Sequence, residues 1–180
     1  MRVITGSARG VTLKTPEGMQ TRPTTDRVKE AMFSIIQFEI PGADVLDLFG
    51  GTGQLGIEAL SRGAKSATFV DAGEPACRLI RENLKRTRLE QSGKVVRSDY
   101  LAYLNRCREK YHIIFLDPPY AEVFLENALK CITEIDILHS DGIIVAERPL
   151  GKELPWEFEG FSRSRDYKYG NTLLTVYRKA

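Results

Sequence analysis

The sequence predicts an α/β fold in which helices cover a mostly parallel sheet of seven strands that ends in an antiparallel hairpin. Three observations lead to this prediction. Short apolar runs alternate with segments of helical periodicity, a glycine-rich loop follows the first apolar run, and two alternating segments meet at a Gly-Asn turn near the end of the chain. Strands that alternate with helices favour a parallel sheet with right-handed crossovers.

Five short apolar runs are expected to form the parallel strands. The first, second, fourth and fifth are apolar enough to be buried on both faces, as strands are when helices lie on either side of a sheet. In chain order the runs are Val45–Phe49, Ser66–Val70, Lys94–Arg97, His112–Leu116 and Gly142–Ala146.

Segments with helical periodicity connect these strands, and the last part of the chain changes pattern. The four expected helices are Leu55–Arg62, Glu74–Arg88, Tyr100–Arg108 and Phe124–Ile135. Beyond them, Phe161–Tyr169 and Thr172–Arg178 alternate in polarity around Gly170 and Asn171, which is a hairpin signal. Strands joined so tightly are antiparallel, so the sheet is expected to end in an antiparallel edge.

Length and composition favour one domain in a reducing, aqueous compartment. A chain of 180 residues is long enough for a single sizeable core, and its net charge of +2 says little about partners. Cys77, Cys107 and Cys131 lack metal-binding spacing, and His112 and His139 are expected to lie near no ligand set, so no metal is predicted. No apolar run reaches the ~18 residues of a membrane span, and the start lacks an apolar signal segment. A soluble, cytoplasmic protein without a membrane partner is expected.

The loop after the first strand contains two overlapping cofactor patterns. From Gly51 it reads G-x-G-x-x-G, the dinucleotide-binding pattern, with Asp71 at about the ~20-residue distance expected of a ribose-binding acid. From Asp47 it reads D-x-F-x-G-x-G, which resembles the S-adenosylmethionine loop of methyltransferases. Gly51 and Gly53 permit positive φ angles and a close approach of the backbone to a ligand. The glycines alone leave both cofactors open.

Two further acids end predicted strands. Asp71 can bind the two ribose hydroxyls that NAD and S-adenosylmethionine share, so it fits both cofactors. Asp99 follows the third strand and is also a good helix N-cap. The antiparallel ending and the lack of room for a second domain favour the methyltransferase over a nicotinamide oxidoreductase.

The letters D-P-P-Y follow the fourth predicted strand directly, at the sheet edge where ligands bind in open α/β folds. The two prolines remove two N–H donors and leave a rigid turn with outward carbonyls. Asp117 and the Pro118 carbonyl can therefore accept hydrogen bonds from an exocyclic amino group and direct its lone pair. Tyr120 can stack on an extruded base. These residues predict methylation of a base amino group, and N6 of adenine or N4 of cytosine fits the motif as well as a guanine does.

The N-terminal end is basic, since residues 1–30 hold six basic and three acidic side chains. Residues 1–20 are predicted to form a protruding hairpin arm on a catalytic core of residues 21–180. The arm places Arg2, Arg9 and Lys14 where they can contact RNA phosphates, and Arg22 is a fourth candidate. The alternative is an ordinary edge strand blunted by charge.

Four segments together resemble one family. "MRVITGSARG", "TRPTTDRVKEAMF", "LDLFGGTGQLGIEALSRGA" and "YGNTLLTVYRK" are similar to the RsmD family, the bacterial 16S rRNA (guanine(966)-N(2))-methyltransferases. The resemblance runs from the first residues to the last. It implies a Rossmann-like class I S-adenosylmethionine methyltransferase fold and a guanine substrate in the 16S rRNA of a small-subunit assembly intermediate.

The resemblance also implies residue roles. Asp47, Gly51 and Gly53 would shape the methionine end of the cofactor site, Asp71 would bind the ribose and Asp99 would lie by the adenine amino group. The guanine would be held by Asp117, Pro118 and Tyr120. A non-catalytic RNA-binding module on the same fold is the alternative from a different functional class.

Overall fold

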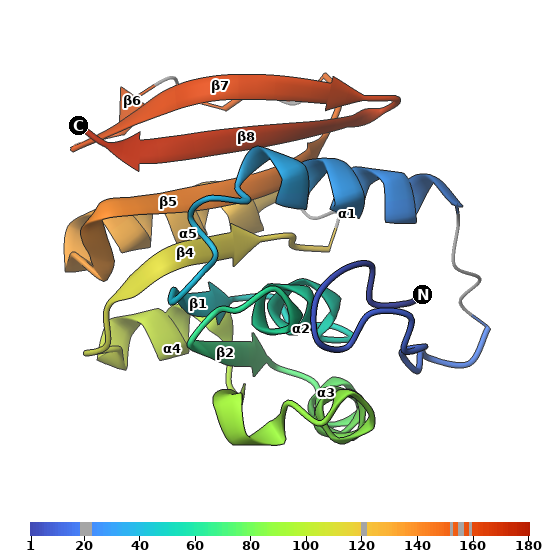
Figure 1. Ribbon diagram of the computed structural model, residues 1–180. Helices are drawn as coiled ribbons and strands as arrows, with labels where there is room; N and C mark the ends of the chain where they lie inside the picture. Colours follow the sequence, from blue (N-terminus) through green and yellow to red (C-terminus); the bar gives the residue numbers. More distant parts are fainter. Residues whose placement is uncertain (19–22, 120–121, 152, 155–156, 159) are drawn as a thin grey trace.

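A computed structural model describes residues 1–18, 23–119, 122–151, 153–154, 157–158 and 160–180 of the chain. Its centre is one mixed sheet with helices on both faces (Figure 1). The strands are β1 (Asp44–Asp47), β2 (Ser66–Asp71), β3 (Gly93–Arg97), β4 (Tyr111–Leu116), β5 (Leu138–Pro149), β6 (Glu157–Phe158), β7 (Phe161–Tyr169) and β8 (Thr172–Lys179). The helices are α1 (Pro23–Ile35), α2 (Gln54–Ser61), α3 (Glu74–Thr87), α4 (Tyr100–Arg106) and α5 (Glu122–Ile135), with a short 3₁₀ turn at Glu90–Ser92.

The strand order in the described residues is β3-β2-β1-β4-β5-β8-β7-β6. The first five strands are parallel, and β8, β7 and β6 continue antiparallel. The mostly parallel sheet of seven strands with an antiparallel hairpin is confirmed, and β6 adds a two-residue strand at the edge. The order of connections reverses between β1 and β4, which opens a crevice at their carboxyl ends.

Strand β5 is longer than the apolar run that predicted it. It begins at Leu138 and continues to Pro149, which pairs with Thr172 of β8. Its additional residues include charged ones, so an apolar-run criterion does not find them. The extension matters because it carries β5 past the end of β4 at the edge of the sheet that holds the crevice.

Alternating side chains divide the core into two layers. Ile113 and Phe115 of β4 face a cluster built with α1, α2 and α3, whereas Ile114 and Leu116 face α4 and α5. Figure 1 shows the first three helices on the near face of the sheet and the last two behind it. This two-sided burial is what the continuous apolar strands predicted. No helix in the described part of the chain is long and apolar enough to cross a lipid bilayer.

The N-terminal segment does not protrude, so that part of the arm prediction is wrong. Its two sides do run antiparallel, with a bridge between Arg2 and Thr12, but Val3 and Leu13 are at most 3% exposed within the main core. Burying these apolar side chains is favourable and draws the segment against the body. Gly6 permits the contact, because a Cβ at its position would lie 1.8 Å from the Ser61 carbonyl oxygen.

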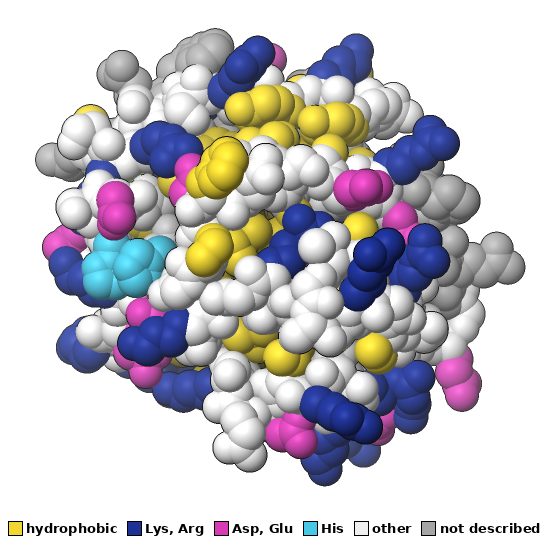
Figure 2. Space-filling view, viewed as in Figure 1, with side chains coloured by type: hydrophobic (Ala, Val, Ile, Leu, Met, Phe, Trp, Pro, Cys, Tyr) yellow, Lys and Arg dark blue, Asp and Glu magenta, His cyan; other side chains and the backbone are white. Residues whose placement is uncertain are grey.

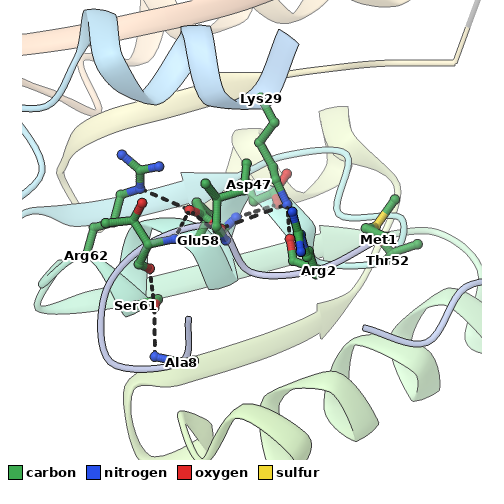
Figure 3. Close-up of polar contacts among 12 residues, drawn as sticks. Met1, Arg2, Ala8, Lys29, Asp47, Thr52, Glu58, Ser61 and Arg62 are labelled. Carbon is green, nitrogen blue, oxygen red and sulfur yellow. Dashed lines mark hydrogen bonds and ion pairs between the residues drawn. The ribbon is translucent and has the colours of Figure 1, made fainter. Parts of the chain in front are cut away.

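A buried carboxylate on α2 ties this segment to two helices (Figure 3). Glu58 is fully buried and accepts hydrogen bonds from the amides of Ile4 (2.9 Å) and Thr5 (3.1 Å). It also pairs with Arg62 at 3.0 Å and with the buried Lys29 of α1 at 3.9 Å. Lys29 in turn donates to the Arg2 carbonyl at 2.7 Å. Burial lowers the pKa of Lys29, an effect that Glu58 opposes.

Replacing Glu58 by Ala is expected to lower the free energy of unfolding by about 3–5 kcal/mol, because it leaves a buried ammonium without its counter-charge and two amides without an acceptor. Urea denaturation measures this loss. Replacing Lys29 by Met in the same protein should recover part of it.

The matched control is Glu82→Ala, which removes an exposed partner of Lys14 at 2.8 Å. This second link between the segment and a helix is solvated, so the urea midpoint should hardly move. Equal effects of the two substitutions would show that Glu58 is not the main attachment.

Candidate active site

A cavity of about 830 Å³ lies at the carboxyl ends of the parallel strands. Its wall is built from the loops that follow β1, β2, β3 and β4, with Met1 and Pro16 contributed by the N-terminal segment. The predicted site residues that line it are Asp47, Gly51, Asp71, Asp99 and Asp117. Parallel pairing brings these residues together although they are spread over 71 positions of the sequence, from 47 to 117.

The glycine loop has the backbone that its pattern predicts. Gly51 and Gly53 have φ angles of +58° and +81°, in the left-handed region that favours glycine. Gly53 immediately precedes α2 and packs against the apolar layer beneath the loop instead of lining the cavity. Gly56 is needed for packing, because a Cβ there would lie 2.3 Å from the Phe69 ring. The loop therefore brings backbone amides to the cavity on a tightly packed helix.

Asp47 ends β1 with a buried carboxyl group. One oxygen, Oδ2, accepts from the Gly56 amide at 3.2 Å, and the other, Oδ1, is buried without a hydrogen-bond partner. Burial raises the pKa of Asp47 to about 8, and the negative charges of Asp117 and Asp71 add to the rise. An unpaired buried acceptor is costly unless a ligand donates to it. A cationic amino group in the cavity would meet both its hydrogen-bonding and its charge requirement.

Gln54, the first residue of α2, supplies a second open acceptor that the sequence analysis did not find. Its Oε1 is buried without a partner, and the residue lines the same cavity as Asp47. An amide side chain inside a glycine loop gives no distinct sequence signal. The two acceptors together fit a ligand end that carries several N–H donors.

Asp71 and Asp99 organise backbone around the cavity. The two oxygens of Asp71 accept from the amides of Gly51 (3.0 Å) and Gly73 (2.9 Å), which joins the loops after β1 and β2. Asp99 caps α4 by accepting from Leu101 and Ala102, both at 3.0 Å. Both side chains also line the cavity, where they can reach a ligand. Their contacts with a ribose and an adenine stay predictions.

Three aromatic residues that the sequence analysis did not single out form one wall of the cavity. Phe49 and Tyr100 have ring centroids 5.1 Å apart, and Phe124 lies 5.3 Å from Tyr100 in an edge-to-face arrangement. They come from the loop after β1, from α4 and from α5, so only the fold brings them together. A flat apolar ring system is the ligand part that such a wall accommodates.

Asp117 follows β4 directly and is half-buried at the rim of this cavity. Burial raises its pKa to about 6. Pro119 lines the cavity, whereas Pro118 is half-buried outside its lining. Tyr120 and Arg22 lie outside the described residues, so their predicted contacts stay predictions.

The amino ends of β1, β4 and β5, on the side of the sheet away from the cavity, hold a cluster that the sequence analysis missed. Donor atoms of Asp44, His112 and His139 lie within 4.8 Å of one another, so the expectation that these histidines lie near no ligand set is wrong. His112 Nδ1 already accepts from the Asp44 amide at 3.0 Å, and the two imidazoles stack with centroids 4.0 Å apart. The prediction of no metal is untested.

The end of the N-terminal segment lies beside α3, where Lys14 pairs with Glu82 at 2.8 Å. Arg2, Arg9 and Lys14 are exposed, and Arg86 of α3 donates to the Thr12 carbonyl at 3.0 Å. The exposed basic residues of α3 are Arg78, Arg81, Lys85 and Arg86, with Arg88 directly after the helix. Figure 2 shows Lys and Arg side chains over this part of the near face. The two segments therefore form one basic surface, which we call the arm and α3 surface.

Comparisons with known proteins point to one family over the whole chain. The family described as conserved hypothetical protein 95 matches residues 1–178. Bacillus subtilis YlbH is 42% identical over 182 residues, 99% of each chain, and Escherichia coli ribosomal RNA small subunit methyltransferase D is 31% identical over 99% of this chain and 90% of its own. The solved structure of Escherichia coli yhhF covers 99% of this chain and 97% of that one, with a TM-score of 0.87 and 31% identity.

Asp47 makes stability depend on pH in a predictable direction. Its pKa is about 8 in the folded protein and ~4 in the unfolded chain, so the unfolded chain loses this proton first as pH rises. Between pH 4 and pH 8 the Asp47 contribution lowers the free energy of unfolding, by at most about 1.4 kcal/mol per pH unit.

The Asp47→Asn variant lacks this contribution. Its stability relative to the wild type is therefore expected to rise from pH 5 to pH 8 and to stay level above that, as measured by urea denaturation. Asp141→Asn, at an exposed position of β5, is the control and should give no such trend. A constant difference between Asp47→Asn and the wild type across this range would contradict the assignment.

Proposed function

The chain belongs to the RsmD family, and on this premise we propose that it methylates the exocyclic N2 of a guanine in 16S ribosomal RNA with S-adenosylmethionine as methyl donor. The observation that carries the proposal is the meeting of the Asp117 turn and the Asp47 loop at one cavity. One loop has open acceptors for a cationic amino acid, and the other has acceptors for an amino substrate.

The cofactor residues suit a nucleoside joined to an amino acid. Asp47 Oδ1 and Gln54 Oε1 would accept from its ammonium group, and Asp71 retains acceptor capacity for two ribose hydroxyls. The aromatic wall would pack against the adenine, with Asp99 near its amino group. The sulfonium of the bound donor supplies an activated methyl group.

The chain's part in the reaction is to hold and orient the amine. An aromatic amino group is a weak nucleophile, because its lone pair is delocalised into the ring. Hydrogen bonds from its N–H groups to the Asp117 carboxylate and the Pro118 carbonyl would draw it toward tetrahedral geometry and direct the lone pair into the cavity. The methylated nitrogen loses its proton readily, so no strong base is required.

Three observations weigh against the other functional classes. A nicotinamide oxidoreductase is disfavoured by the antiparallel β8, β7 and β6 and by relatives named as methyltransferases. A non-catalytic RNA-binding module would have no use for two open buried acceptors in a large cavity. The turn itself does not choose between guanine, adenine and cytosine.

The arm and α3 surface would bind the RNA. It offers Arg2, Arg9 and Lys14 for phosphates, with Arg22 as a further candidate, and phosphate contacts position a protein without reading sequence. We therefore propose that residues 1–20 serve as the RNA-binding part of a single domain whose catalytic core is 21–180. A small-subunit assembly intermediate in the cytoplasm would present the guanine already extruded.

Replacing Asp117 by Ala is expected to lower kcat for methyl transfer by about 100-fold or more, because its hydrogen bond strengthens as the amine approaches the transition state. Single-turnover transfer of a labelled methyl group to small subunits from cells lacking the gene measures this rate. Binding of S-adenosylhomocysteine, measured by calorimetry, should be retained and shows that the variant is folded. Near-normal turnover would show that the turn is only scaffold.

Reversing the charge of Arg2 and Arg9 should weaken RNA binding and flatten its salt dependence by ~0.7–0.9 units of log–log slope for each lost phosphate contact. Binding measured between about 50 and 200 mM salt gives the slope. The control is the double variant Lys65→Glu and Lys94→Glu, which makes the same change in net charge. Both lysines are exposed, one directly before β2 and the other in β3. Equal slopes in both double variants would remove the RNA role of the arm.

A further inference from the structure

A second carboxyl group, which the sequence analysis did not find, lies beside Asp117. Strands β4 and β5 are parallel and adjacent, and their last paired residues are Leu116 and Ala146. The next residue on each strand is therefore a carboxylic acid, Asp117 on one and Glu147 on the other. Neighbouring strands lie about 4.8 Å apart, within the span of one base edge.

The two acids continue the same face of the sheet. Phe115 of β4 and Val145 of β5 belong to the core layer under α1, and side chains alternate along a strand. Asp117 and Glu147 follow these two residues by two positions. Both are half-buried above that core layer, with Asp117 in the cavity lining and Glu147 on the neighbouring strand just outside it.

Within the described residues, no lysine or arginine pairs with either carboxyl group. Arg148, which follows Glu147, instead donates to Thr175 of β8 and to Asp166 of β7. Burial, followed by the charge of Asp117, raises the pKa of Glu147 to about 8. Two neighbouring half-buried acids that no described cation pairs with are unfavourable for folding, and a ligand with several N–H donors would satisfy them.

The Watson–Crick edge of guanine offers such a set of donors. Its N2 amino group stands next to the N1–H group, whereas the ring atom next to the amino group is an acceptor in adenine (N1) and in cytosine (N3). Once Asp117 and Pro118 hold the amino group, the chemistry of this neighbouring ring atom distinguishes the bases. A hydrogen-bond acceptor beside Asp117 would therefore stabilise bound guanine and not bound adenine or cytosine.

We propose that Glu147 accepts a hydrogen bond from N1–H of the target guanine and thereby selects guanine over adenine and cytosine. This inference rests on the proposed function, and it supplies the base choice that the D-P-P-Y turn leaves open. Glu147 is a specificity-determining residue, since the methyl group is transferred to N2 and not to the atom it contacts.

The test compares guanine with 2-aminopurine, which keeps the 2-amino group but has an acceptor at N1. Each base is placed at the target position of 16S rRNA by ligation, and the RNA is assembled with small-subunit proteins. Above pH 8, where Glu147 is ionised, the wild type should prefer guanine by about tenfold to a hundredfold in kcat/KM, as one hydrogen bond to an ionised group suggests. Equal rates on the two bases would overturn the proposal without any variant.

Glu147→Gln should lower kcat/KM on guanine by a similar factor and bring the preference close to one, because an amide can also donate to the N1 of 2-aminopurine. Asp141→Asn, on the same strand, should keep the wild-type preference. Binding of S-adenosylhomocysteine should be unchanged in both variants, which excludes misfolding as the cause. A preserved preference in folded Glu147→Gln would overturn the role of Glu147. Failure of the wild type to methylate either substrate would instead count against the proposed function.

Discussion

Parallel pairing of β1, β4 and β5 constrains the whole molecule, because it places three carboxyl groups at one edge of the sheet. Asp47 ends β1, Asp117 follows β4 and Glu147 lies in the part of β5 that extends past β4. Burial raises the pKa of each. Three carboxyl groups that burial places close together lower the stability of the protein without a ligand. The two apolar layers that cover the strands offset this cost. Ligands that carry N–H donors or positive charge would stabilise the three carboxyl groups further.

The N-terminal segment shows how the rest of the fold closes around that edge. Glu58 fixes the segment to α2 and, through Lys29, to α1, while Met1 and Pro16 reach the cavity wall. The same segment brings Lys14 next to α3. The cavity and the proposed RNA surface thus share one attachment to the body of the protein.

The sequence predicted those features that follow from local pattern. Apolar runs located the five parallel strands, Gly170 marked the hairpin, and strand ends placed Asp47, Asp71 and Asp117 at the cavity. The position of the N-terminal segment was mispredicted, because its attachment depends on Glu58, which reads in sequence as one charge in a helix. Gln54 and Glu147 were missed for a related reason: each gains meaning only from neighbours brought close by the fold.

The most direct test of the account is mass mapping of methyl groups on 16S rRNA from cells that lack the gene, before and after incubation of their small subunits with the purified protein and S-adenosylmethionine. The account predicts one added methyl group, which fragmentation assigns to N2 of a guanine. A methyl group on N6 of adenine or N4 of cytosine, or no added methyl group at all, would contradict it.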